Sequence, residues 1–167
     1  MRYAISTLAA SAVALAMACS SPTSTSSELT RELNALKAAT TSFHDFNAAQ
    51  AAGYTTQLTD CMVDSSLGGM GFHQAKASLI NGTVAVTTPQ VLLYEPQADG
   101  SVQLVAVEYI IPYTLHSRNS PPPMLFGQRF KQNDTFQLWG LHAWVWRDNP
   151  SGVFADWNPN VNCNGVH

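Results

Sequence analysis

Apolar side chains recur at the spacing of one helix face near the start of the chain. They lie three, four or seven residues apart, as positions on a single face of an α-helix do. The set comprises Leu29, Leu33, Leu36, Phe43 and Phe46. Thr25-Ser26-Ser27-Glu28 has the form of a capping box, and Gly53 is typical of helix ends. The pattern therefore predicts one helix between these two signals.

Three later runs of apolar and β-branched residues predict β-strands. They cover residues 91–95, 102–111 and 136–146. Asp99-Gly100, between the first two runs, is typical of a hairpin turn. A helix followed by such strands predicts an α+β fold, with the N-terminal helix packed on a curved antiparallel β-meander.

The segments between these runs carry weaker patterns. Residues 84–86 are expected to add a short edge strand, and residues 74–80 a helical turn. Residues 55–71 and the polar connection 114–135 show no regular period, so we expect both to be irregular.

The first eighteen residues have the features of an export signal. Arg2 precedes a charge-free apolar run over residues 5–17, which is too short to span a membrane. Ala16-Met17-Ala18 places small residues at the positions that a signal peptidase reads. We therefore expect residues 1–18 to be a signal peptide and the mature protein to be exported.

Cys19 directly follows this signal. Leu15–Cys19 resembles a bacterial lipobox, although the branched residue stands four positions before the cysteine instead of three. Residues 19–27 are a polar, Ser- and Thr-rich tether. We expect Cys19 to carry a lipid anchor in the bacterial cell envelope. The alternative is ordinary cleavage after Ala18, which leaves a secreted protein.

The composition of the chain limits its partners. Residues 28–167 have the length of a single globular domain. Only 11% of the residues are charged, against about 25% in typical domains, and the formal net charge is −3. Without a basic patch, we expect no nucleic-acid partner, and a membrane only through the lipid anchor.

Cys61 and Cys163 remain once Cys19 is assigned to the anchor. In an oxidising compartment an isolated pair is most simply a disulfide. Closing so long a loop stabilises the fold by about 4–5 kcal/mol in the chain-entropy model. The alternative, two free thiols that bind a soft metal, requires a reducing compartment.

Glu108 interrupts a run that is apolar on both faces. Strict alternation places Leu104, Ala106 and Ile110 on the same strand face as this carboxylate. A buried carboxylate costs several kcal/mol unless it is paired, protonated or bound to a metal. Glu108 is therefore the main candidate for a functional residue, and a possible general base.

His142 raises the same question in the third predicted strand. Alternation gives it a common face with Leu138, Trp144 and Trp146, and Gly140 on that face indicates a close approach by another group. If the second and third strands are neighbours, the side chains of Glu108 and His142 meet.

Two more histidines complete a candidate site. His73 follows a glycine-rich stretch, and His44 lies beside the apolar face of the predicted helix. The hypothesis is a mononuclear metal site formed by His73, Glu108 and His142, with His44 as a fourth ligand. These ligands suit zinc, copper, iron or manganese. The alternative is a buried Glu–His ion pair that only stabilises the fold, because no sequence-local ligand motif is present.

Several motifs resemble those of a family of uncharacterised exported bacterial proteins and lipoproteins. The similarity covers most of the chain from Phe43 onward. Its main motifs are Gly69-Met70-Gly71-Phe72-His73, Tyr94-Glu95-Pro96, Val107-Glu108-Tyr109, Leu141–Ala155, Trp157–Val161 and Cys163. The resemblance implies that four residues stand at positions of the family's sequence pattern: His44, His73, Glu108 and His142. It implies no activity. Relatives often carry a His-Tyr pair shortly before the Leu-His, where this chain has Thr135-Phe136.

The sequence thus leaves two functions open. The first is a small exported domain that binds a small ligand or a metal ion at a His/Glu pocket. The second is a structural or interaction module of the cell envelope. A binding site requires His73, Glu108 and His142 to converge on a cavity that solvent reaches.

Overall fold

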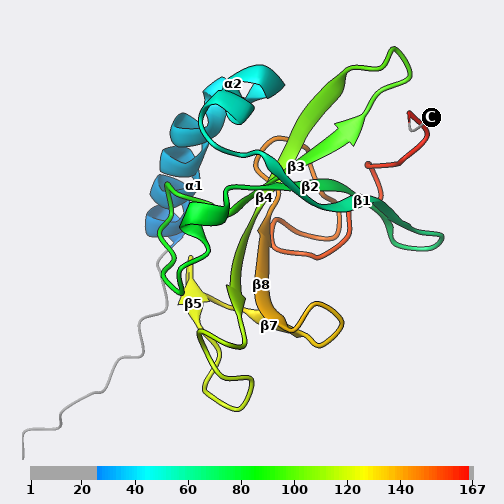
Figure 1. Cartoon of the computed structure of the whole chain (residues 1–167). Coiled ribbons are helices and arrows are strands. Elements are labelled where there is room, and N and C mark those ends of the chain that lie inside the picture. The colour runs from blue at the N-terminus through cyan, green and yellow to red at the C-terminus, as the bar shows by residue number, and fades with distance from the viewer. Residues whose placement is uncertain (1–25, 166–167) are drawn as a thin grey trace, which may run out of the picture.

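The computed structural model describes residues 26–165 and shows a helical layer against one face of a curled six-stranded antiparallel sheet (Figure 1). The strand order is β1-β2-β3-β4-β8-β7. This confirms the predicted α+β class, with an N-terminal helix on a curved antiparallel sheet. The predicted signal peptide, Cys19 and most of the tether lie outside the described residues. Ser26 and Ser27, assigned to the tether, form the first turn of α1.

The helical layer has three segments instead of the one predicted helix. They are α1 (Ser26–Thr40), the 3-10 turn η1 (Thr41–His44) and α2 (Phe46–Ala51). Asp45 has extended backbone angles, and its carboxylate accepts a hydrogen bond from the N–H of Asn47 at 2.9 Å. Asp45 therefore caps a new helix, as short polar side chains do at helix starts, and this interrupts the first one.

A hairpin occupies the region that we predicted to be irregular. It consists of β1 (Thr56–Asp64) and β2 (Gly68–Ala75). Its register shifts at three places, so side chains do not alternate regularly between the two faces along β1. Because of this irregularity, the sequence of β1 lacks the alternation of apolar and polar residues that predicts a strand. The predicted helical turn over 74–80 was also wrong in part, because only η2 (Ala77–Leu79) is helical.

The strands β3 (Val91–Pro96) and β4 (Val102–Pro112) form the predicted hairpin. Their register shifts between Leu93 and Tyr94, so β4 contains one extra residue at this point. Leu104 consequently packs on the helix side of the sheet, while Ala106 packs on the opposite side. The prediction that Leu104 shares a face with Glu108 was wrong for this reason.

The strand β8 (Leu138–Ala143) lies beside β4, with the short strand β7 (Lys131–Asn133) outside it. It is shorter than the predicted run 136–146, because the backbone N–H of Trp144 donates to the carbonyl of Val153 at 2.9 Å. Trp146, beyond the strand, packs on the helix side, and its indole N–H donates to Thr40 Oγ1 at 3.1 Å. The prediction that Trp146 shares a face with His142 was therefore wrong.

The connections differ from the predictions as well. The polar connection 114–135 contains a separate small hairpin of β5 (Met124–Leu125) and β6 (Gln128–Arg129). Residues 84–86, which were predicted to form an edge strand, are not part of any strand. Instead the carbonyl of Val86 accepts a hydrogen bond from the Tyr109 hydroxyl at 2.6 Å, which places this segment over the core.

Two hydrophobic clusters lie on the two sides of the sheet. The helix-side cluster is the larger one and includes Leu36, Leu92, Tyr94, Leu104, Val107, Tyr109, Ile111 and Leu141. The cluster on the opposite side includes Ala75, Val91, Leu93, Ala106, Ile110 and Trp144. The helices cover only the first side, so the second side remains available for a cleft.

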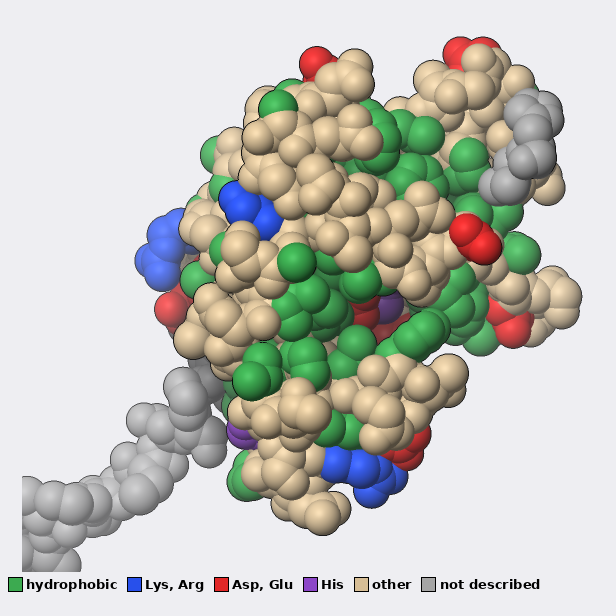
Figure 2. Space-filling model, in the orientation of Figure 1, with side chains coloured by type: hydrophobic (Ala, Val, Ile, Leu, Met, Phe, Trp, Pro, Cys, Tyr) green, Lys and Arg blue, Asp and Glu red, His purple; other side chains and the backbone are tan. Residues whose placement is uncertain are grey.

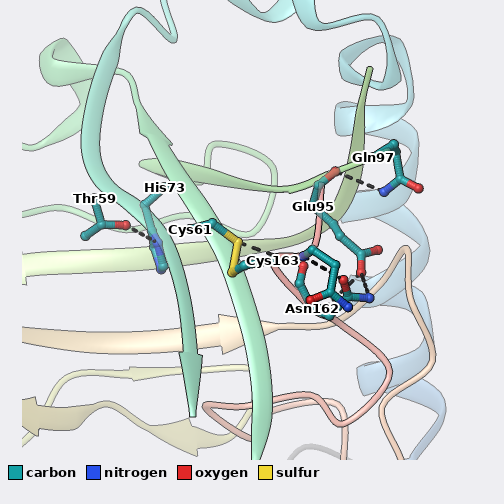
Figure 3. The surroundings of a disulfide bond; sticks show 8 residues. Thr59, Cys61, His73, Glu95, Gln97, Asn162 and Cys163 are labelled. Carbon is teal, nitrogen blue, oxygen red and sulfur yellow. Dashed lines mark hydrogen bonds between the residues drawn. A yellow bond between two sulfur atoms is a disulfide. The ribbon is translucent and has the colours of Figure 1, made fainter. Parts of the chain in front are cut away.

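Cys61 and Cys163 form the predicted disulfide, with their Cα atoms 5.8 Å apart. It joins the edge strand β1 to the C-terminal segment. Figure 3 shows the disulfide between two polar contacts, Thr59 with His73 on one side and Glu95 with Asn162 on the other.

Candidate metal centre

Three strands bring His73, Glu108 and His142 together on the side of the sheet away from the helices. Glu108 in β4 lies directly opposite His142 in β8 in the strand register. His73 reaches the same place from β2, two strands away from β4. One nitrogen or oxygen atom from each of the three side chains lies within 4.8 Å of the others. The predicted convergence of these three residues is therefore present.

The Glu108 carboxylate lies between the two imidazole rings. Its Oε2 is 3.6 Å from His73 Nε2, and its Oε1 is 3.9 Å from His142 Nε2. These distances exceed those of hydrogen bonds. Within residues 26–165 the carboxylate accepts no hydrogen bond, and His142 Nε2 is buried without a hydrogen-bond partner. Buried polar atoms of this kind require another partner.

The other ring nitrogen of each histidine faces an oxygen atom. His73 Nδ1 lies 2.8 Å from Thr59 Oγ1, and His142 Nδ1 lies 3.8 Å from Asp156 Oδ1. With its proton on Nδ1, each ring points the Nε2 lone pair toward Glu108. Oxygen partners that fix the tautomer and the orientation of the ring in this way are usual around metal-ligating histidines.

Burial controls the protonation of these side chains. Burial, and to a smaller extent the neighbouring His142, lowers the pKa of His73 to about 3, so that His73 is neutral at physiological pH. Burial also raises the pKa of Glu108, while His142 opposes this shift. A neutral imidazole is the form that binds a metal ion, and a cation beside Glu108 stabilises its charged form.

Asp156 carries a stable negative charge beside His142. Burial disfavours this charge, but contacts of the carboxylate with His142 and Lys131 lower its pKa to about 2. Lys131 Nζ lies 2.8 Å from Asp156 Oδ1. The carboxylate is therefore ionised at neutral pH and can orient the His142 ring.

Glycines make room for this arrangement at two positions. A Cβ atom on Gly140 lies 2.8 Å from Glu108 Oε1, which is closer than ordinary packing allows. This confirms the close approach that the glycine indicated. Gly71 has a φ of +84°, and a Cβ added there would clash with the carbonyl oxygen of Tyr94. Only glycine fits this bend of β2, two residues before His73.

The three side chains lie at the floor of a cleft. The cavity has a volume of about 540 Å³ and is bordered by β1, β2, β4, β7, β8 and the segment around Asp156. Figure 2 shows acidic and histidine atoms at the bottom of a hollow whose surroundings are mainly hydrophobic. The group is thus buried in the protein but borders a space that opens to solvent.

His44, predicted as a fourth ligand, is not part of this group. It lies at the end of η1 in the helical layer, where its ring packs against Trp146 with the centroids 4.4 Å apart. The prediction was wrong because the helical layer covers the opposite face of the sheet from Glu108.

Sequence reasoning missed Thr59 and Asp156, which contact the two histidines. Thr59 lies in a segment without a regular pattern, and Asp156 lies in the C-terminal segment. The predicted disulfide was the signal that connected them, because Cys61 follows Thr59 by two residues and Cys163 follows Asp156 by seven.

Comparison of the chain with protein-family models, with curated proteins and with solved structures gave no match. Ligands at about 2.1 Å from a tetrahedral ion lie about 3.4 Å from one another. The distances of 3.6 and 3.9 Å from Glu108 to the two histidines are close to this spacing.

Proposed function

We propose that this protein binds one transition-metal ion through His73 Nε2, the Glu108 carboxylate and His142 Nε2. The observation that carries the proposal is the buried carboxylate between two ring nitrogens at 3.6 and 3.9 Å, with no hydrogen bond from the carboxylate to either nitrogen. A cation in the middle compensates the desolvated charge and occupies both nitrogen lone pairs. Zinc, copper, iron and manganese all accept this ligand set.

The alternative is a purely structural Glu–His pair. Charge-assisted hydrogen bonds between such groups are typically about 2.7–2.9 Å long, since burial strongly favours direct contact. Glu108 instead stays 3.6 Å or more from both rings. Its placement at the floor of an open cleft also favours binding, because a group that only stabilises the fold has no need for a cavity beside it.

Three protein ligands leave at least one coordination position open toward the cleft. Metal sites that keep such a position bind water or a substrate there, whereas structural sites are closed by protein ligands. The proposal is therefore a binding site that also has the form of a catalytic one.

We further propose that the protein is exported and anchored by a lipid on Cys19. The Cys61–Cys163 disulfide supports an oxidising compartment. No helix within residues 26–165 is long and apolar enough to cross a membrane.

Metal content measured by elemental mass spectrometry tests the proposal. The full chain is expressed with export into an oxidising compartment, stripped with a chelator and reloaded separately with Zn²⁺, Cu²⁺, Mn²⁺ or Fe²⁺ without oxygen. We expect one equivalent of at least one metal in the wild type, and below about a tenth of an equivalent in E108Q and H142A.

The matched control is H44A, because His44 packs on Trp146 outside the group. It is expected to keep the full equivalent. Metal that remains in E108Q and H142A, or a folded wild type that takes up none of the four ions, contradicts the proposal and favours the structural pair.

A further inference from the structure

The cleft above the proposed metal site is larger than an ion and its water ligands require. Its volume of about 540 Å³ lies within the range of about 300–1,000 Å³ that is usual for sites of small organic ligands. Such sites combine mainly apolar walls with a few polar groups that orient the ligand. The floor formed by His73, Glu108 and His142 provides the polar groups.

The walls of the cleft are mainly apolar side chains. Six of them come from four strands and from the turn before β8: Leu58, Met62, Met70, Ile110, Phe136 and Leu138. Leu58 and Phe136 are 43% and 47% exposed, although large apolar side chains gain by burial. Because both border the same cavity, a ligand that enters the cleft covers apolar surface that the fold itself leaves in water.

The charges in the cleft select the head group of the ligand. With a divalent ion bound, the ion and Lys131 exceed the carboxylates Glu108 and Asp156 by one positive charge. A ligand with one negative charge therefore neutralises the site, and an oxygen donor fits the open coordination position. A dianion or a cation leaves an uncompensated charge in a cavity with apolar walls.

We propose that the site takes a monoanionic organic ligand, with a carboxylate-type head on the metal and an apolar body along the walls of the cleft. The inference rests on the proposed metal site. It assigns the head to the position opposite His73, Glu108 and His142, and the body to the surface formed by Leu58 and Phe136.

A cobalt-substituted protein tests this inference, because the visible absorption of Co²⁺ reports both its binding and its coordination. The probes are octanoate, acetate and octanol, which separate the contributions of head and body. We expect octanoate to change the Co²⁺ spectrum at a concentration at least about tenfold lower than acetate does, since its added methylene groups bury apolar surface. Octanol, without the anionic head, is expected to leave the spectrum unchanged.

Two variants locate the body of the ligand. L58S and F136S are expected to reduce the preference for octanoate over acetate at least about threefold while Co²⁺ binding is retained. L67S is the matched control, because Leu67 is 50% exposed but lies outside the cleft, and it should keep the preference.

The outcomes separate this inference from the proposed function. Failure of the wild type to bind Co²⁺, Zn²⁺, Cu²⁺, Mn²⁺ or Fe²⁺ overturns both. Co²⁺ binding with equal effects of octanoate and acetate, or with no spectral change by either, overturns only the ligand class. An octanoate preference that survives in both L58S and F136S overturns the assigned position of the body.

Discussion

The tyrosine hydroxyl groups on the helix side of the sheet and the Glu108–His142 pair on the opposite side are partnered differently. On the helix side, the hydroxyl groups of Tyr54, Tyr94 and Tyr109 donate hydrogen bonds to backbone carbonyls at 2.6–2.8 Å. On the opposite side, which faces the cleft, Glu108 Oε1 and His142 Nε2 lie 3.9 Å apart and form no hydrogen bond. Both faces use neighbouring residues of β4, since Tyr109 follows Glu108 directly.

This difference teaches where stability and binding reside in the molecule. The helix side gains stability from apolar burial and from partnered hydroxyl groups. The opposite side gives up part of that stability to hold a carboxylate and two imidazole Nε2 atoms without hydrogen bonds between them, which is typical of sites prepared for a ligand. Unfolding and metal binding measured on the same variants therefore separate the two faces.

Removal of the disulfide should have the largest effect on the side of the sheet that faces the cleft. The double variant C61A/C163A should lower the free energy of unfolding by about 2–5 kcal/mol, because the disulfide closes a loop of 102 residues. It should also weaken metal binding, since the bond joins the segments of Thr59 and Asp156. Urea unfolding and metal titration measure the two effects. Unchanged affinity in the folded variant would show that these contacts do not depend on the disulfide.

A core substitution on the helix side should change stability alone. Leu36 is fully buried in the larger cluster, so L36A should lower the free energy of unfolding by about 2–5 kcal/mol. The folded fraction should bind metal as the wild type does. Urea unfolding and metal titration below the unfolding transition check this. A clear loss of affinity would mean that the two faces are coupled.

Substitution of Asp156 should affect mainly the metal. D156N removes the carboxylate that faces His142 Nδ1, and such a loss typically weakens metal binding about 10- to 100-fold. Isothermal titration with an ion that the wild type takes up measures the change. The matched control is D134N, because Asp134 pairs with Arg118 at the surface and does not itself line the cleft. Equal affinities of D156N and D134N would exclude an orienting role for Asp156.

Substitution of Glu108 should have the smallest effect on the stability of the metal-free protein. It should stabilise the protein at higher pH, whereas the substitutions above destabilise it. Burial raises the pKa of Glu108 above its ordinary value of 4.5, so the folded state binds its proton more tightly than the unfolded state. This contribution to stability is complete below pH 4.5 and disappears as the pH rises through the folded pKa. E108Q, which does not titrate, should therefore gain stability relative to the wild type as the pH rises.

Thermal unfolding without metal, at pH 4 and at pH 8, measures this prediction. The stability of E108Q should exceed that of the wild type by more at pH 8 than at pH 4. A lower stability of E108Q at pH 8 would mean that the ionised carboxylate stabilises the fold, as the structural pair requires.

The sequence predicted the central features of both the fold and the site. The α+β class, the β3–β4 hairpin and the disulfide followed from periodicity, turn residues and cysteine count. The meeting of Glu108 and His142 followed from two polar residues in apolar strands, and the β4–β8 register confirms it. These features depend on local patterns, which a single sequence contains.

The errors have a common physical cause, because long-range contacts overrode the local pattern. The bulge in β4 moved Leu104 to the helix side, and the bend after Ala143 moved Trp146 there as well. His44 was assigned to the site because it is a histidine near the core, but the helical layer lies on the other face. Thr59 and Asp156 were missed because only the folded chain brings their segments to the histidines.

Anomalous X-ray diffraction from crystals of the metal-loaded protein tests the central claim most directly. The account predicts one strong peak, about 2.0–2.2 Å from His73 Nε2, a Glu108 oxygen and His142 Nε2, at the floor of the cleft. A peak on other residues, or a Glu108 carboxylate hydrogen-bonded directly to a histidine with no peak between them, would contradict it.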